Sequence, residues 1–173
     1  LYYLLLQPWS VVFGSSILAL RSFSVALAGL TIAAAYLFTS EAFRSRAAGL
    51  TAALFLAVSG FQIQYAWEAR MYTLGTFLVL LSSWFLIKAV RSSVAKEDKA
   101  SYWLWFGYAL TASAMIYVHY YALFTLVAQA VFAVGYLLLR TRGRIGEIIS
   151  QRLTWHGLGA AALIAVAYAP WLP

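Results

Sequence analysis

The chain has 173 residues, of which 64% are hydrophobic and 10% are charged, and its mean hydropathy is +0.83. Because a water-soluble domain carries about 25% charged residues, this composition excludes an ordinary soluble fold and predicts an all-α integral membrane protein. The formal net charge of +7 does not call for a nucleic-acid partner, because basic cytoplasmic loops explain it. The absence of cysteine excludes disulfides and thiolate metal sites.

The apolar runs predict a polytopic transmembrane bundle of about six membrane helices, forming one transmembrane domain over residues 1–173. A short interfacial helix is expected first, at residues 1–13, because Pro8 interrupts an apolar run too short to span the bilayer. The expected spans are residues 22–39, 47–63, 70–87, 102–118, 120–139 and 153–169. The chain begins at Leu1 without a methionine, so we expect an internal piece of a larger membrane protein.

Basic residues predict the orientation of these spans. Ten of the twelve lysines and arginines fall in alternate loops, namely Arg44, Arg46, Lys88, Arg91, Lys96, Lys99, Arg140, Arg142, Arg144 and Arg152. The positive-inside rule makes these loops cytoplasmic. Residues 64–70, 119–121 and 170–173 then face the periplasm, the cell exterior or an organelle lumen, and His156 lies at the cytoplasmic interface.

One polar stretch, Gln64–Tyr72, separates two of the expected spans and combines a carboxylate, a guanidinium and aromatic rings. Glu68 is the single acid expected on the outer side, and ionisable residues at a membrane tend to be functional; the structural alternative is an acid that complements a helix dipole. Arg70 suits a phosphate ligand or, alternatively, extends toward the headgroups. Glu68 and Tyr72, four residues apart, should share a helix face. Arg70 should point elsewhere, so we expect no Glu68–Arg70 ion pair along one helix.

His119 and Tyr120 form a second candidate group, at the outer end of the next helix hairpin. A histidine there can donate to a phosphate, bind a metal or carry protons. The structural alternative is an aromatic belt at the membrane surface. The expected topology places this group on the same face as Glu68.

Several site classes are excluded by the sequence. It contains no phosphate-binding glycine loop, no His-Glu-x-x-His zinc helix and no Gly-x-Ser-x-Gly nucleophile elbow. Glu68 has no second outward carboxylate with which to form a glycosidase-like pair. A transporter or flippase segment and a non-catalytic membrane scaffold remain alternatives; a transporter should show internal repeats or broken helices, and the sequence predicts neither.

The stretch Gln64–Tyr72 resembles the second conserved stretch of bacterial relatives of the protein O-mannosyltransferases. Residues 1–5, which follow a His-Pro-Pro in that family, and the segments 19–21 and 119–124 agree with it in order and spacing. Trp67 departs from the pattern, in which this position is polar. The resemblance covers essentially the whole chain.

The resemblance implies a membrane glycosyltransferase of the C-type fold in the bacterial inner membrane, which takes a sugar from a polyprenyl-phosphate donor on the outer face. It places the catalytic acid in a loop before Leu1. Glu68 corresponds to the second acidic position, which shapes the site or holds a divalent metal. Arg70 would meet the donor phosphate, with Tyr72, His119 and Tyr120 lining the same cavity.

Overall fold

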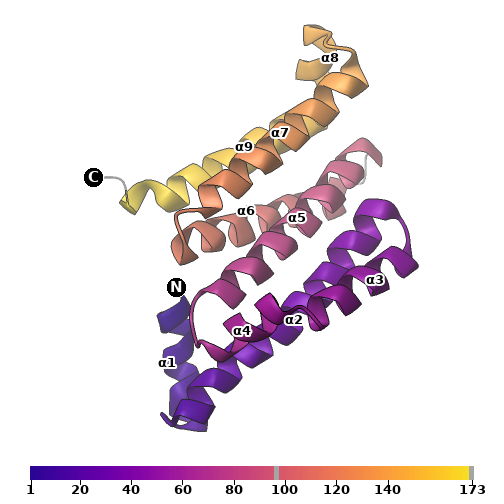
Figure 1. Cartoon of the computed structure of the whole chain (residues 1–173). Coiled ribbons are helices and arrows are strands. Elements are labelled where there is room, and N and C mark those ends of the chain that lie inside the picture. The colour runs from indigo at the N-terminus through magenta and orange to yellow at the C-terminus, as the bar shows by residue number, and fades with distance from the viewer. Residues whose placement is uncertain (96–97, 172–173) are drawn as a thin grey trace.

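The computed structural model describes residues 1–95 and 98–171, and every regular element in them is a helix (Figure 1). Lys96, Glu97, Leu172 and Pro173, which belong to the predicted loop and the outward C-terminal segment, lie outside the described residues. The elements are α1 (Tyr2–Phe13), α2 (Ile17–Phe43), α3 (Arg46–Ala57), α4 (Gly60–Trp67), α5 (Tyr72–Ala95), α6 (Asp98–Val118), α7 (Ala122–Thr141), α8 (Ile145–Ser150), α9 (Arg152–Tyr168) and the 3-10 turn η1 (Ala169–Trp171).

Local sequence explains where the first helices begin and end. Gly14 ends α1 with a φ of 88°, a conformation that glycine adopts at little cost. Ser16 then caps α2, its side chain accepting a hydrogen bond from the backbone N–H of Ala19, and Ser45 caps α3 in the same way through Ala48. These serines satisfy backbone donors that a helix start leaves open.

Three helices, α2, α5 and α7, are long and apolar enough to cross a membrane. The pair α3 and α4 counts as a fourth span if it is one broken helix, because the two are bent by 56° around Val58 and Ser59. The expected continuous span at 47–63 is therefore wrong, as is the expectation that no helix is broken. The structure shows three or four candidate membrane spans in the described residues, together with the shorter α9 and the less apolar α6.

Helix α5 is central to the packing, with α2 on one side and α6 on the other, and α9 lies against α6 (Figure 1). Small side chains allow this close approach: Ala89 of α5 and Ala112 of α6 are both 0% exposed. Helix α1 packs on the start of α2, where Tyr2 and Ser24 share a hydrogen bond of 2.8 Å and the Trp9 indole donates to the carbonyl of Ala19.

The turns gather at two opposite ends of the bundle (Figure 1). The site end holds the turn between α4 and α5, the turn between α6 and α7, and η1. The basic end holds the turn between α2 and α3 and the short helix α8. At the basic end Arg91 of α5 joins the Glu41 carboxylate and donates to the carbonyls of Glu41 and Ala42, which ties α5 to the C-terminus of α2.

Candidate active site

The carboxylate of Glu68 and the guanidinium of Arg70 lie in a turn between two helices. Helix α4 ends at Trp67 and α5 begins at Tyr72, and Ala69 between them has a φ of 48°, in the left-handed region. The left-handed residue reverses the chain locally, and the Arg70 Nε lies 4.0 Å from a Glu68 carboxylate oxygen.

This ion pair corrects the sequence-based expectation. Glu68 and Arg70 were expected to point apart along one continuous helix, and Glu68 was expected to share a helix face with Tyr72. The helix is interrupted between them, so helical spacing does not apply. The pair is loose, since its distance is long and the Arg70 side chain is 63% exposed, and such surface pairs contribute under about 1 kcal/mol. Arg70 therefore keeps most of its donors available to a ligand.

Glu68 is held from the other side by α4. The Gln64 side-chain amide, one helical turn earlier, donates to Glu68 Oε1 at 3.4 Å. The two carboxylate oxygens thus have different partners, an amide and a guanidinium. This arrangement orients the carboxylate while its side chain remains 32% exposed.

Aromatic rings line the same turn. Tyr65 contacts Phe61 within α4 at a centroid distance of 4.5 Å and meets Tyr72, the first residue of α5, edge-on at 4.7 Å. These contacts close the α4–α5 corner around the turn. They position Tyr72, whose ring is partly exposed.

Arg21 is a site residue that was absent from the predicted set. Its guanidinium carbon lies 5.7 Å from the ring centre of Trp67, a cation–π geometry that joins the start of α2 to the end of α4. Two signals in the sequence pointed to it, the 19–21 segment of the resemblance and its place outside the basic loops. The departure at Trp67 also has an explanation, because an indole offers Arg21 a better π face than a polar side chain does.

His119 and Tyr120 lie in the turn between α6 and α7, where three rings stack. The His119 ring is 4.8 Å from the rings of both Tyr120 and Tyr121, and its Nδ1 accepts a hydrogen bond from the backbone N–H of Tyr121 at 3.2 Å. That bond uses Nδ1, so Nε2 is the ring nitrogen through which His119 can bind a ligand. The hydrogen bond with Tyr121 raises the pKa of Tyr120 above its usual value of 10.0, so its hydroxyl is a neutral donor.

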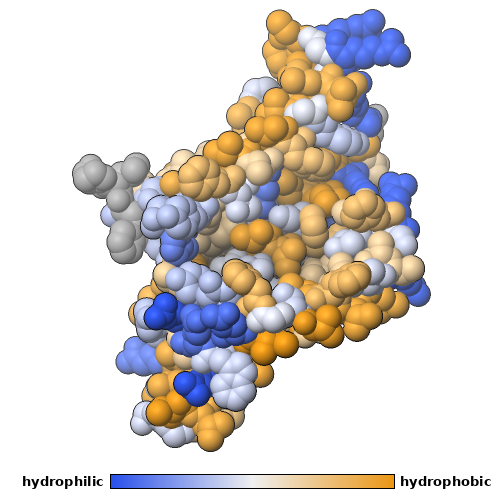
Figure 2. Space-filling model, viewed as in Figure 1, coloured by the Kyte–Doolittle hydropathy of each residue, from blue (hydrophilic) through white to orange (hydrophobic). Residues whose placement is uncertain are grey.

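The two predicted groups share one end of the molecule without touching. In the part of the chain that the structure describes, no hydrogen bond, ion pair or ring contact joins Glu68 or Arg70 to His119 or Tyr120. Their helices are adjacent: a Cβ added to Gly75, in the first turn of α5, would lie 3.7 Å from Val118 at the end of α6. Figure 2 shows hydrophilic side chains over both turns on this face.

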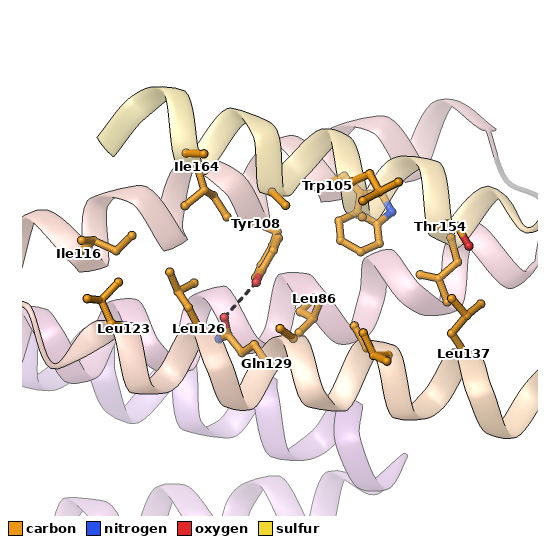
Figure 3. A pocket seen from close by; sticks show the side chains of 18 of the residues that line it. Leu86, Trp105, Tyr108, Ile116, Leu123, Leu126, Gln129, Leu137, Thr154 and Ile164 are labelled. Carbon is orange, nitrogen blue, oxygen red and sulfur yellow. Dashed lines mark hydrogen bonds between the residues drawn. The ribbon is translucent and has the colours of Figure 1, made fainter. Parts of the chain in front are cut away.

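A cavity of about 500 Å³ lies between α7 and the helices α5, α6 and α9, away from the Glu68 turn (Figure 3). Its lining is almost entirely apolar, with Leu86, Leu126 and Ile164 directed into it. One polar bridge crosses it, where the Tyr108 hydroxyl donates to Gln129 at 3.2 Å. Ile116 and Leu123 line the end of the cavity nearest the His119 turn.

His156 differs from its prediction as an isolated interfacial residue. It is half-buried at the basic end, and its Nδ1 lies 3.1 Å from the Ser101 hydroxyl and 3.4 Å from that of Ser93. The Trp105 indole donates to Ser93 as well, at 2.9 Å. This network joins α5, α6 and α9, and the spacing of residues from three helices could not reveal it.

No group of three or more histidine, cysteine, aspartate or glutamate side chains that could hold a metal ion is found among the residues that the structure describes. The stretch around Glu68 therefore supplies a single carboxylate toward the divalent metal that the resemblance allowed. A carboxylate alone does not provide the oxygen-ligand set of Mg²⁺ or Ca²⁺.

Comparison with known proteins completes the description. No curated protein and no solved structure matches the chain. A family model does match, and it covers residues 1–172, so that all the helices and both turns of the site end fall within it. The chain belongs to the dolichyl-phosphate-mannose-protein mannosyltransferase family, a family of membrane glycosyltransferases.

Proposed function

We propose that this chain is part of the membrane domain of an enzyme that transfers a hexose from a polyprenyl-phosphate donor to an acceptor on the outer face of the membrane. The structural observation that supports the proposal is that two guanidiniums contact adjacent residues of one segment: Arg21 lies over the Trp67 ring, and Arg70 lies 4.0 Å from the Glu68 carboxylate. The geometry suits a phosphate monoanion or dianion at a membrane surface, because guanidiniums form charge-assisted, often bidentate bonds to phosphate.

The reaction needs positive charge where the leaving group develops negative charge. When the sugar leaves its lipid carrier, the electron pair of the broken bond goes to the phosphate oxygen, and preorganised donors stabilise that charge. Arg70 and Arg21 serve this role in the proposal, with His119 and Tyr120 as further donors from the neighbouring turn. Glu68 orients Arg70 through their ion pair.

The acceptor hydroxyl must lose its proton to a base as it attacks. Glu68 is a poor sole candidate because its carboxylate is already bound by Gln64 and Arg70. The resemblance assigns this base to a loop before Leu1, and the proposal follows it. No step is assigned to a metal, since no group of three or more metal-binding side chains occurs among the described residues.

The donor's hydrocarbon tail needs an apolar site that begins near a phosphate-binding group. The cavity between α7 and α9 lies away from the Glu68 turn, but its lining is apolar and it begins next to the His119 turn, which supplies the further phosphate donors of this proposal. An apolar cavity of this kind does not hold water favourably. The donor's hydrocarbon tail then lies along α7, and the donor's phosphate lies at the site end.

The proposed orientation follows the basic residues. Six spans, with α6 and α9 crossing in addition to the candidates α2, α5, α7 and the bent pair, place the basic end in the cytoplasm and the site end outside. This arrangement corresponds to a bacterial inner membrane with the site toward the periplasm or exterior.

The broken helix gives the transporter alternative one specific observation. Discontinuous helices line substrate paths in transporters, and α3 and α4 are bent by 56°. Val58 at the break is exposed and apolar, however, and the ionisable residues lie at the far end of α4. The break therefore brings no charged group to membrane depth, which favours the transferase.

The test uses Glu68→Gln and Arg70→Ala in the full-length protein, with Arg46→Ala as the matched control at the basic end. Loss of a preorganised donor costs about a hundredfold to a thousandfold in rate, so Arg70→Ala should lower sugar transfer from a polyprenyl-phosphate donor by that order. Glu68→Gln should lower it less, and Arg46→Ala should leave it unchanged. Wild-type transfer by both site variants would reject the site. Intact transfer with lost flipping of the lipid-linked sugar would support the transporter.

A further inference from the structure

A second surface that combines arginines with exposed apolar side chains lies at the opposite end of the molecule from the proposed active site. The arginine loop, residues 140–152, links α7 to α9 and contains the short helix α8. It holds four arginines and one glutamate, a net charge of +3. Figure 2 shows its hydrophilic atoms beside apolar ones at the α8 corner of the molecule.

The apolar part of this surface is exposed and directed outward. Ile145 and Ile149 are 73% and 55% exposed, and they are four residues apart, on one face of α8. Trp155, in the first turn of α9, is 61% exposed, and its indole N–H donates to the carbonyl of Ile149 at 2.9 Å. Two isoleucines and an indole thus form one apolar patch.

The patch is held in place by bonds between α8 and α9. The Thr154 hydroxyl donates to the carbonyl of Ile148, which also accepts from the backbone N–H of Gln151, and the Trp155 indole donates to the carbonyl of Ile149. Two side chains of α9 thus bind carbonyls at the C-terminus of α8. At the other end, Arg142 and Gly143 are both left-handed and turn the chain sharply after α7. These bonds and the turn hold α8 in place against α9, with its two isoleucines on one exposed face.

Arginines accompany the patch in the same loop. Arg140, Arg142 and Arg144 are all exposed, and Arg144 pairs with Glu147 at 2.9 Å. The one acid of the loop is thereby neutralised, which leaves Arg140 and Arg142 to attract anions. Exposed apolar side chains in a loop rich in arginine have the composition of a segment that lies in a membrane–water interface.

We propose that the arginine loop docks on the anionic phospholipid headgroups of the leaflet at the basic end. The isoleucines and Trp155 enter the headgroup layer, and the arginines bind the lipid phosphates. Juxtamembrane arginines are attracted to an anionic leaflet over about a Debye length. This docking is independent of glycosyl transfer, because it involves none of the residues of the site end.

These 173 residues contain no cysteine, and any cysteine elsewhere in the full-length protein is first replaced by serine. A single cysteine at Gly146, where an added Cβ meets nothing within 4 Å, carries an environment-sensitive fluorophore on α8. The full-length labelled protein is placed in nanodiscs of phosphatidylcholine alone, or of equal parts phosphatidylcholine and phosphatidylglycerol. We expect a blue-shifted emission, quenched by headgroup-level spin-labelled lipid, in the anionic discs only.

Two matched double variants test the role of the arginines. Arg140→Gln/Arg142→Gln removes two charges from the loop, and Arg44→Gln/Arg46→Gln removes two from the other turn of the basic end. In each pair the two arginines are separated by one residue, and one of the two is left-handed: Arg142 has a φ of 50° and Arg44 a φ of 51°. At about fivefold per arginine, the loop pair should weaken docking roughly twenty-fivefold, whereas the control pair should keep the shift in emission.

Three further experiments show whether charge causes the docking. Arg140→Lys/Arg142→Lys should retain docking, because attraction to an anionic surface depends on positive charge and does not require the planar guanidinium group. Added salt should release the wild-type loop from the anionic discs. Ile145→Ser/Ile149→Ser should abolish the quenching. Equal emission in neutral and anionic discs, or equal loss with the control pair, would overturn the proposal.

Discussion

At the scale of single residues, close helix approach depends on Gly49. A Cβ added there would lie 1.9 Å from the Ser40 hydroxyl oxygen and 2.8 Å from the backbone carbonyl of Tyr36. The serine can rotate, but the carbonyl belongs to α2 and cannot move without displacing the helix. The contact between α2 and α3 therefore requires glycine at this position.

Gly49→Val should separate α3 from α2 and lower the free energy of unfolding by about 1–3 kcal/mol. Gly29→Ala is the matched control, since Gly29 also lies in a membrane helix and its added Cβ meets nothing within 4 Å. Unfolding in mixed detergent measures both. Equal stability of the two variants would show that α2 and α3 are not closely packed.

Ala69 is the second residue with a structural cost, because its left-handed conformation is unfavourable for a side chain with a Cβ by about 1–2 kcal/mol. Ala69→Gly should relieve it and raise stability by up to about 1 kcal/mol with transfer activity retained. Ala69→Val should do the reverse and displace Arg70 from Glu68. Thermal unfolding and sugar transfer, measured on both variants, test these expectations. A valine variant more stable than the wild type would contradict the left-handed conformation at position 69.

At the scale of elements, α7 is the least buried of the three helices long and apolar enough to cross a membrane. The apolar cavity separates it from α6 and α9, and a polar cluster joins it to the bundle at mid-height. Gln129 is buried and uses its whole amide: it donates to Ser82 and Ser83 of α5 at 3.0 Å each and accepts from Tyr108 of α6. One side chain thus holds three helices in register around the cavity.

Gln129→Leu should cost about 1–2 kcal/mol, the upper range for side-chain hydrogen bonds within membranes. The loss should shrink in a Tyr108→Phe background, since the two residues share a bond, and a double-mutant cycle would give a coupling energy above about 0.5 kcal/mol. Additive costs would indicate that the bond contributes nothing. If α7 frames the donor's chain, the variant should also raise the KM for the lipid-linked sugar.

At the scale of the whole molecule, the six-span topology is open to a direct test with single cysteines, because the 173 residues contain none and any cysteine elsewhere in the full-length protein can first be replaced by serine. Four exposed positions report on the spans: Ala95 ends α5, Tyr121 follows α6, Gly146 lies in α8 after α7, and Ala169 follows α9. An impermeant maleimide should label cysteines at 121 and 169 in intact cells. Those at 95 and 146 should react only after permeabilisation. Labelling of 95 and 121 from one side would show that α6 does not cross.

Composition alone determined the class of protein. A chain in which about two-thirds of the residues are apolar does not form a soluble domain, so a membrane protein with apolar segments was predictable. Its helices were predictable as well, because a segment in lipid must satisfy its own backbone hydrogen bonds. The stretch Gln64–Tyr72 stood out for a related reason: charge among apolar neighbours is costly wherever it lies. The motifs at 64–72 and 119–124 also indicated the family to which the chain belongs.

Tertiary structure decided the features that depend on backbone breaks and on distant neighbours. Helical spacing placed Arg70 away from Glu68, and the left-handed Ala69 brought it back. The Trp67 partner Arg21 is 46 positions away in the sequence, and the His156 network draws on three helices. Periodicity reports which face of one helix is apolar, but it contains no information about which helix will cover that face or where the chain will turn. Those choices are made by packing between segments far apart in the chain.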